Sequence, residues 1–228
     1  MKTSSGKLVS PICSTLLVSA VMLVALPLQS GCNVIGVMAY KFAGPTKVKP
    51  QYELPPVPTL VIAESFGSAN RSTMNSDRLA RVVSSSLSQH LSKNPNLLIV
   101  SQDELDKLRS NRLADYPKMS TAAIARAVGA KQVVYIDLQE VAVAGMAGSQ
   151  VYKGVASAYV RVIDAETQKV LWPDGSEQGT PVAFESSPMG KSSKTRNSTL
   201  AATIDGLGDR TAKLFYEWQP VSDNLPQN

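Results

Sequence analysis

Few side chains in this sequence have a type and spacing suited to covalent or metal chemistry. Both cysteines, Cys13 and Cys32, lie in the first 32 residues, so the rest of the chain holds no thiol nucleophile, zinc–thiolate site or internal disulfide. The sole histidine, His90, leaves one candidate proton shuttle and no histidine-based metal site. No nucleophile motif accompanies it, and we interpret it as a surface or boundary residue. We therefore predict neither a metal nor a cofactor.

Three carboxylates near the ends of expected strands are the other candidates for acid–base chemistry. Glu64 follows one apolar segment, and Asp137 and Glu140 lie in another. Paired carboxylates can support hydrolysis when their spacing is suitable. Acids at strand ends are commonly solvated, so we predict no catalytic residue and no enzyme. A hydrolase that uses these carboxylates is kept as the alternative.

Two loop segments offer weaker chemistry. Residues 142–150 (AVAGMAGSQ) lack the glycine spacing and the Lys-Ser/Thr ending of a phosphate loop, and we interpret them as a flexible connection with an apolar surface. Lys191, Lys194 and Arg196 would suit an anionic headgroup or glycan. Such a short basic run is also typical of a solvated loop, which is our interpretation.

Length and composition favour one globular domain with extensions. The chain has 228 residues, of which 43% are hydrophobic and 18% charged, and this argues against wholesale disorder or a protein with many membrane spans. The formal charge of +5 falls to +3 if the segment carrying Lys2 and Lys7 is removed. That balance is too mild to indicate a nucleic-acid partner.

The first residues have the organisation of an export signal. Lys2 and Lys7 precede an almost wholly apolar run over residues 12–28 that includes the helix breaker Pro27. As a helix this run would measure roughly 26 Å, somewhat less than the ~30 Å hydrocarbon core of a bilayer. An uncleaved signal anchor holding a structural domain at the membrane is therefore a second alternative.

The run Leu28-Gln29-Ser30-Gly31-Cys32 resembles the lipobox of bacterial lipoproteins. That processing needs small residues before the cut and a thiol after it, because the cysteine sulfur receives a diacylglyceryl group. We predict a signal peptide over 1–31, cleavage between Gly31 and Cys32, and acyl chains such as palmitate on Cys32. Gln29 departs from the pattern, since an aliphatic residue usually stands there. Asn33, in place of the Asp associated with inner-membrane retention in enteric bacteria, favours the outer membrane.

The next segment is predicted to connect this anchor to a folded body. Residues 32–58 begin with an apolar stub and continue as GPTKVKPQYELPPVP over 44–58, in which five residues are proline. Proline at that density favours an extended, semi-rigid spacer. We place the domain at 59–218 and a disordered tail at 219–228.

Periodicity predicts alternating strands and helices in the domain. Ser101 and Ser120 are expected to cap two of the helices, and Gly129 to end the second. The predicted strands are 59–66, a short one within 94–101, 132–143, 151–164, 169–172 and 180–184, and the predicted helices are 76–91, 101–108, 121–128 and 198–218. Early alternation and late hairpins indicate an α/β (α+β) domain of three layers, with a mixed sheet flanked by helices.

Several of these segments resemble a group of envelope lipoproteins. The segments are VIAESF (61–66), LLIVSQDELDKL (97–108), VGAKQVVYIDL (128–138) and VRVIDAETQKVLW (160–172). They are similar to the domain shared by curli-secretion (CsgG-like) lipoproteins, LpoB-type activators of peptidoglycan synthases and the amino-terminal domain of TolB. The Gly129-Ala130 pair and the hairpin carrying Asp164, Thr167 and Trp172 bear the similarity.

The resemblance implies a cell-envelope domain that faces the periplasm and binds protein partners in assembly or regulation of an envelope complex. It implies no active site, and it allows for a homo-oligomer. Residues 142–150 are too short for the membrane-crossing hairpins of a secretion pore, in which each strand needs about 9 to 11 residues. We therefore expect a membrane-anchored lipoprotein that binds proteins, with an envelope hydrolase as the alternative.

Overall fold

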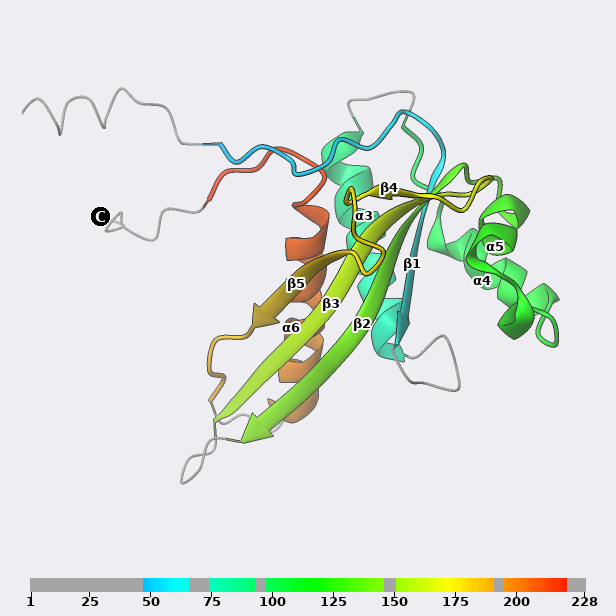
Figure 1. Ribbon diagram of the computed structural model, residues 1–228. Helices are drawn as coiled ribbons and strands as arrows, with labels where there is room; N and C mark the ends of the chain where they lie inside the picture. Colours follow the sequence, from blue (N-terminus) through cyan, green and yellow to red (C-terminus); the bar gives the residue numbers. More distant parts are fainter. Residues whose placement is uncertain (1–46, 66–73, 93–96, 146–150, 191–194, 221–228) are drawn as a thin grey trace, which may run out of the picture. The chain divides into compact units, whose positions relative to one another are not determined.

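The computed structural model describes residues 47–65, 74–92, 97–145, 151–190 and 195–220 (Figure 1). A compact unit spans Val48–Trp218. The predicted signal peptide, Gly31 and Cys32 lie outside the described residues, as do Lys191, Lys194 and residues 221–228 of the predicted tail. In the described ranges, no helix has the length and apolar character needed to cross a membrane.

The centre of the unit is a mixed sheet, as the sequence predicts, and it has five strands where the sequence suggests six. The strands are β1 (Thr59–Ser65), β2 (Gln132–Gly145), β3 (Tyr152–Asp164), β4 (Val170–Trp172) and β5 (Thr180–Glu185). β1 pairs with β2 in parallel, and the other pairs are antiparallel. β4 and β5 follow one another along the same edge of β3, so β3 is the most extensively paired strand.

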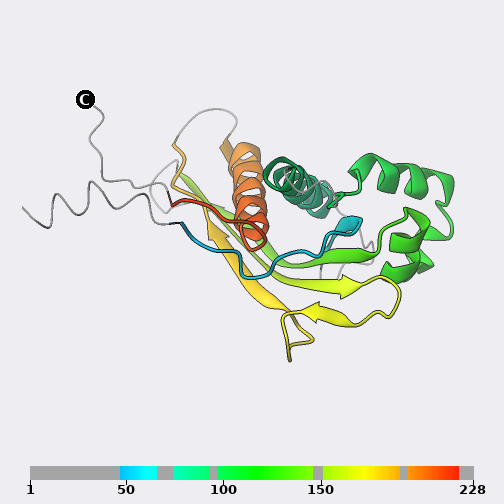
Figure 2. The ribbon, with the colours of Figure 1, turned by 90° about the horizontal axis from the view of Figure 1, so that it is seen from above.

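Two long helices cover one face of this sheet. They are α3 (Met74–Leu91) and α6 (Thr195–Ala212), which lie side by side over the strands (Figure 2). Their buried residues Leu79, Leu87 and Leu207 form a core with the side chains of β1, β2 and β3 that point toward them, such as Val61 and Val160. We call this side of the sheet the inner face.

Two short helices give β1 a second cover. They are α4 (Gln102–Asn111) and α5 (Thr121–Ala127), and Leu105 and Ile124 from them pack with Leu60 and Ile62. Because Leu60 and Ile62 alternate along β1 with Val61, which belongs to the inner-face core, β1 is buried on both sides. The predicted three layers are therefore present at the β1 end of the sheet.

The local signals at helix ends are confirmed. The Ser101 side chain accepts a hydrogen bond from Asp103 N at 3.2 Å and begins α4, and Ser120 accepts one from Ala123 N at 3.2 Å and begins α5. Gly129 follows α5 with a φ of 74°. A residue with a side chain is strained in that conformation, which explains glycine at this position.

Two predicted elements differ from those observed. The strand expected within 94–101 is a single parallel bridge between Thr59 and Ile99. The last helix ends at Ala212, and the prediction that it continues to residue 218 is wrong. Leu214 and Trp218 instead lie in an irregular segment that runs beside the start of the unit.

The glycines of α6 have a packing role that composition alone does not reveal. Glycine was expected to weaken this helix because of its low helix propensity. A Cβ on Gly206 would overlap the Phe184 ring of β5, and one on Gly208 would lie 2.6 Å from Val82 Cγ1 of α3. The absent side chains therefore allow α6 to approach both the sheet and α3.

The described part of the proline-rich segment packs on the domain. Gln51 N donates to Leu214 O at 2.8 Å, and Leu54 is 7% exposed in the inner-face core. Tyr52 packs near Trp172, with ring centroids 5.9 Å apart. Residues 48–58 therefore belong to the compact unit, ahead of the domain start that the sequence suggests at Thr59.

Candidate functional site

The face of the sheet opposite α3 and α6, which we call the outer face, carries the strand carboxylates that the sequence singles out. Glu64 and Asp137 are register partners on β1 and β2. Asp137 in turn faces Tyr159 on β3, and Tyr135 faces Arg161. The intervening residues, such as Ile136, belong to the inner-face core, so the alternation of each strand sends these polar side chains outward.

A hydrogen-bonded cluster fixes the middle of the outer face. The Tyr135 hydroxyl donates to Glu64 Oε2 at 2.7 Å, and the Arg161 guanidinium carbon lies 4.7 Å from the centroid of the Tyr135 ring. Arg161 also donates to the Glu177 carbonyl at 2.6 Å. Burial of the phenol, followed by its hydrogen bond to Glu64, raises the pKa of Tyr135. At neutral pH Tyr135 is therefore a donor held between a carboxylate and a cation.

The three candidate carboxylates have different surroundings. Glu64 accepts the hydrogen bond of Tyr135, and Glu140 is exposed beyond a bulge that separates it from Leu138. Over the described ranges, no group of three or more histidine, cysteine or acidic side chains is placed to hold a metal ion. The cluster of Tyr135, Arg161 and Glu64 offers both charge and aromatic surface for contact with another molecule.

His90 lies away from the outer face, as an exposed residue near the end of α3. Its ring stacks on Tyr216, with centroids 4.0 Å apart and planes inclined by 10°. The Tyr216 hydroxyl lies 3.2 Å from Ser86 Oγ. The interpretation of His90 as a surface residue is confirmed, and its contacts attach the segment after α6 to α3.

The far half of the outer face consists of β2 and β3 extending past the end of β1 (Figure 1). Lys153 forms an ion pair with Glu185 of β5, and Val155, the register partner of Glu185, is 37% exposed. Residues 142–145 of the predicted flexible connection are part of β2, and the remaining five lie outside the described ranges. Arg196 is exposed in the first turn of α6.

The two edges of the sheet are partly closed to a further strand. On β5, Pro181 has no N–H, and the Ala183 carbonyl accepts a hydrogen bond from Arg210 at 2.8 Å. On β1, the Thr59 backbone is bonded to Leu98 and Val100, and Gln102 Nε2 donates to the Val61 carbonyl at 2.9 Å. Both edges therefore offer fewer free backbone groups for the addition of a strand.

Sequence reasoning identified Glu64, Asp137 and Glu140 but missed Tyr135 and Arg161, which form the cluster with Glu64. Tyr135 stands two positions before Asp137 and Arg161 two positions after Tyr159, so strict alternation along each strand would have placed all four on one face. The register that brings Tyr135 opposite Arg161 is a tertiary property, and the single sequence does not contain it.

Several solved structures are similar to this chain at low identity. The lipoprotein GNA1162 from Neisseria meningitidis is 16% identical with a TM-score of 0.40, and the match covers 68% of this chain and 99% of that chain. PelC from Paraburkholderia phytofirmans, solved as a dodecamer, is 12% identical with a TM-score of 0.38, over 75% of this chain and 96% of that chain. The C-terminal domain of LpoB from Salmonella enterica is 18% identical with a TM-score of 0.30, over 60% and 84% respectively.

No protein-family model and no curated protein matches the sequence. At TM-scores of 0.30 to 0.40, the structural similarities carry no inference about activity or partners. The resemblance to curli-secretion lipoproteins and to TolB stays a prediction. What the protein does must therefore be inferred from its own residues.

Proposed function

We propose that this protein is a bacterial envelope lipoprotein, acylated at Cys32, whose domain binds another envelope protein through the outer face. The observation that carries the proposal is the cluster of Tyr135 and Arg161 with Glu64 on the sheet face opposite α3 and α6, beside the part of that face that α4 and α5 cover. Tyrosine and arginine are among the side chains enriched at the energetic centre of protein interfaces. Side chains already fixed in place lose less conformational entropy on binding.

The charges of the outer face suggest the chemistry of the partner. Asp137 and Glu140 carry negative charge, and Arg161 and Lys153 carry positive charge on the neighbouring strand. A partner whose surface places positive charge opposite Asp137 and Glu140 and negative charge opposite Arg161 and Lys153 would bind this face in one defined orientation. A uniformly acidic polymer would be repelled by these carboxylates.

The proposed function is binding and not catalysis. Glu64 Oε2 accepts the hydrogen bond of Tyr135 at 2.7 Å, and the proposal gives Glu64 the role of holding that hydroxyl in place. The rival hydrolase is tested by Glu64→Gln and Asp137→Asn in assays against envelope glycans and peptides. Hydrolysis by the wild-type protein that either substitution abolishes would overturn the binding proposal.

The anchor defines how far the domain can reach. About 15 residues separate Cys32 from Val48, where the compact unit begins, and an extended chain of that length spans roughly 50 Å. The proposed partner therefore presents its surface within about that distance of the membrane, for which we propose the periplasmic side of the outer membrane.

The lipid anchor is tested by comparing Cys32→Ser with Cys13→Ser in cells fed labelled palmitate. Cys13 lies in the predicted signal peptide, so its variant should be labelled and processed like the wild type. The Cys32→Ser protein should accumulate at precursor size without label. Equal processing of the two variants would contradict acylation at Cys32 and favour an uncleaved anchor.

Partner binding is tested with a photo-crosslinking amino acid at position 159 on the outer face. Position 88, an exposed serine on α3, is the matched control on the opposite side of the sheet. We expect one discrete crosslinked protein from position 159, and its yield should fall when Arg161→Glu reverses the central charge. The same products from positions 159 and 88 would contradict docking on the outer face.

A further inference from the structure

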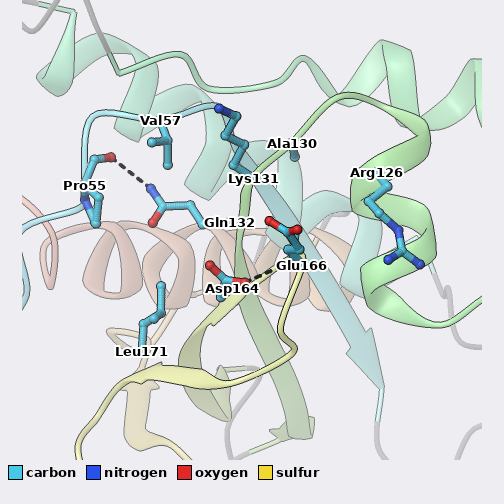
Figure 3. A pocket seen from close by; sticks show the side chains of 10 residues that line it. Pro55, Val57, Arg126, Ala130, Lys131, Gln132, Asp164, Glu166 and Leu171 are labelled. Carbon is cyan, nitrogen blue, oxygen red and sulfur yellow. Dashed lines mark hydrogen bonds between the residues drawn. The ribbon is translucent and has the colours of Figure 1, made fainter.

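A cavity of about 490 Å³ opens at the end of the sheet where β1 and β2 begin and β3 ends (Figure 3). Its walls come from the segment that leads into β1, the turn that leads into β2, and the turn between β3 and β4. Pro55, Val57 and Leu171 supply an apolar part of the lining. The volume lies in the range of small-ligand sites. This cavity is separate from the outer face, and the inference below does not rest on the proposed function.

One buried side chain in this cavity has an acceptor without a donor. Gln132 is 1% exposed, and its Nε2 donates to the Pro55 carbonyl at 3.0 Å and to Thr59 Oγ1 at 2.7 Å. Thr59 donates its own hydroxyl proton to the Val57 carbonyl, so the amide of Gln132 can face only one way. Gln132 Oε1 then has no hydrogen-bond partner among the described residues. An unsatisfied buried acceptor is costly, and a ligand N–H would satisfy it.

Charged side chains of both signs line the same cavity. Lys131 and Arg126 lie on the side of the cavity formed by the turn before β2 and by α5, and Asp164 and Glu166 lie on the β3–β4 turn (Figure 3). Asp164 Oδ1 accepts hydrogen bonds from Glu166 N at 3.0 Å and from Thr167 Oγ1 at 2.8 Å, which fixes that carboxylate. The site therefore offers positions for an anionic group and for a cationic group within one cavity.

We propose that this cavity binds a small zwitterion of the amino-acid or short-peptide class. Gln132 Oε1 accepts an N–H of the ligand, the carboxylates of Asp164 and Glu166 attract its ammonium group, and Lys131 and Arg126 bind its carboxylate. Charge-assisted hydrogen bonds of this kind are stronger than neutral ones and give the site its selectivity. A ligand with only one of the two charges loses half of these contacts.

The test is calorimetric titration of the full chain, purified in detergent, with the dipeptide Ala-Ala. N-acetylated and C-amidated Ala-Ala each remove one of the two charges. We expect the free dipeptide to bind with a Kd below about 10 mM and each blocked form to bind at least about tenfold more weakly. No binding of free Ala-Ala up to that concentration, or equal binding of either blocked form, would overturn the proposal.

Site-specific variants assign the binding to this cavity. Gln132 is not substituted, because its Nε2 bonds hold the segment before β1, whereas Lys131 and Glu166 are exposed. Lys131→Ala and Glu166→Gln should each weaken dipeptide binding about tenfold. Lys118→Ala, which removes an exposed lysine outside the cavity lining, should bind like the wild type. Unchanged affinity in both cavity variants would refute this location.

Discussion

Val48 and Trp218 exchange two backbone hydrogen bonds, from Val48 N to Trp218 O at 2.8 Å and from Trp218 N to Val48 O at 3.1 Å. This antiparallel bridge joins the first and last residues of the compact unit. The segment that follows Val48 continues along Leu214 and reaches the inner-face core through Leu54. Residues that the composition assigns to a spacer therefore stabilise the domain.

Leu54→Ala should lower the free energy of unfolding by about 2–4 kcal/mol, because it removes a side chain that is 7% exposed and leaves a cavity in the core. Leu113→Ala is the matched control, since Leu113 is 77% exposed and should change stability by less than about 0.5 kcal/mol. Urea denaturation followed by circular dichroism measures both values. If Leu54→Ala lowered the free energy of unfolding as little as Leu113→Ala does, residues 48–58 would not contribute to the core.

Gly208→Ala should destabilise the protein, although alanine is the better helix former by about 1 kcal/mol. The new Cβ would lie 2.6 Å from Val82 Cγ1 and 2.9 Å from Val82 Cβ, so α6 and α3 must move apart. Overpacking of this kind costs about 1–3 kcal/mol. A double-mutant cycle with Val82→Ala checks the cause, because that substitution removes the closer contact and should recover part of the loss. Stabilisation by Gly208→Ala alone would contradict this packing.

The features predicted correctly from sequence are local ones. Ser101, Ser120 and Gly129 act on backbone groups within a few residues, so their roles can be read from spacing. The long strands were predicted for the same reason, since alternation over many residues is a strong signal. The mixed sheet then followed from the order of strands and helices.

The features that were missed depend on residues far apart in the chain. The apolar periodicity of the last helix continues to Trp218, but the backbone there is bonded to Val48, more than a hundred residues earlier. Gly208 is favoured by Val82 on another helix and not by its own neighbours. Gln132 gave no signal at all, because a polar residue at the start of a strand is ordinary until Pro55 and Thr59 enclose it.

Tyr135→Phe should cost about 1 kcal/mol at neutral pH through loss of the hydrogen bond to Glu64, and this cost should shrink in alkali. Burial and the Glu64 hydrogen bond raise the pKa of Tyr135 above its ordinary value of 10.0. The folded state therefore favours the neutral phenol. The stability that Tyr135 contributes is fully present below about pH 10 and is lost as the pH rises further. Denaturation of both proteins at about pH 7 and pH 11 gives the comparison. If the difference in stability between the wild type and Tyr135→Phe stayed constant over this pH range, the raised pKa of Tyr135 would be contradicted.

Asp164 should make the β3–β4 turn sensitive to acid. The Thr167 amide and hydroxyl, and then the Glu166 amide, donate hydrogen bonds to this carboxylate and lower the pKa of Asp164 below its ordinary value of 3.8. The folded state therefore favours the charged form, so this contribution to stability is present above pH 3.8 and is lost as the pH falls through the folded-state value. In Asp164→Asn, which keeps an acceptor oxygen but cannot ionise, that acid-dependent loss should be absent.

Two substitutions of Thr167 distinguish the contribution of its hydroxyl group from that of the backbone turn. Thr167→Ser keeps the hydroxyl donor to Asp164, and Thr167→Val keeps the branched shape but removes the donor. We expect the serine variant to follow the acid profile of the wild type and the valine variant to lose part of the stability near neutral pH, with a smaller further loss in acid. The free energy of unfolding, measured by urea denaturation between about pH 2 and pH 7, reports both effects. Identical profiles for the two variants would show that the backbone amides alone hold the carboxylate, and the Asp-x-x-Thr spacing of this hairpin would then have no electrostatic role.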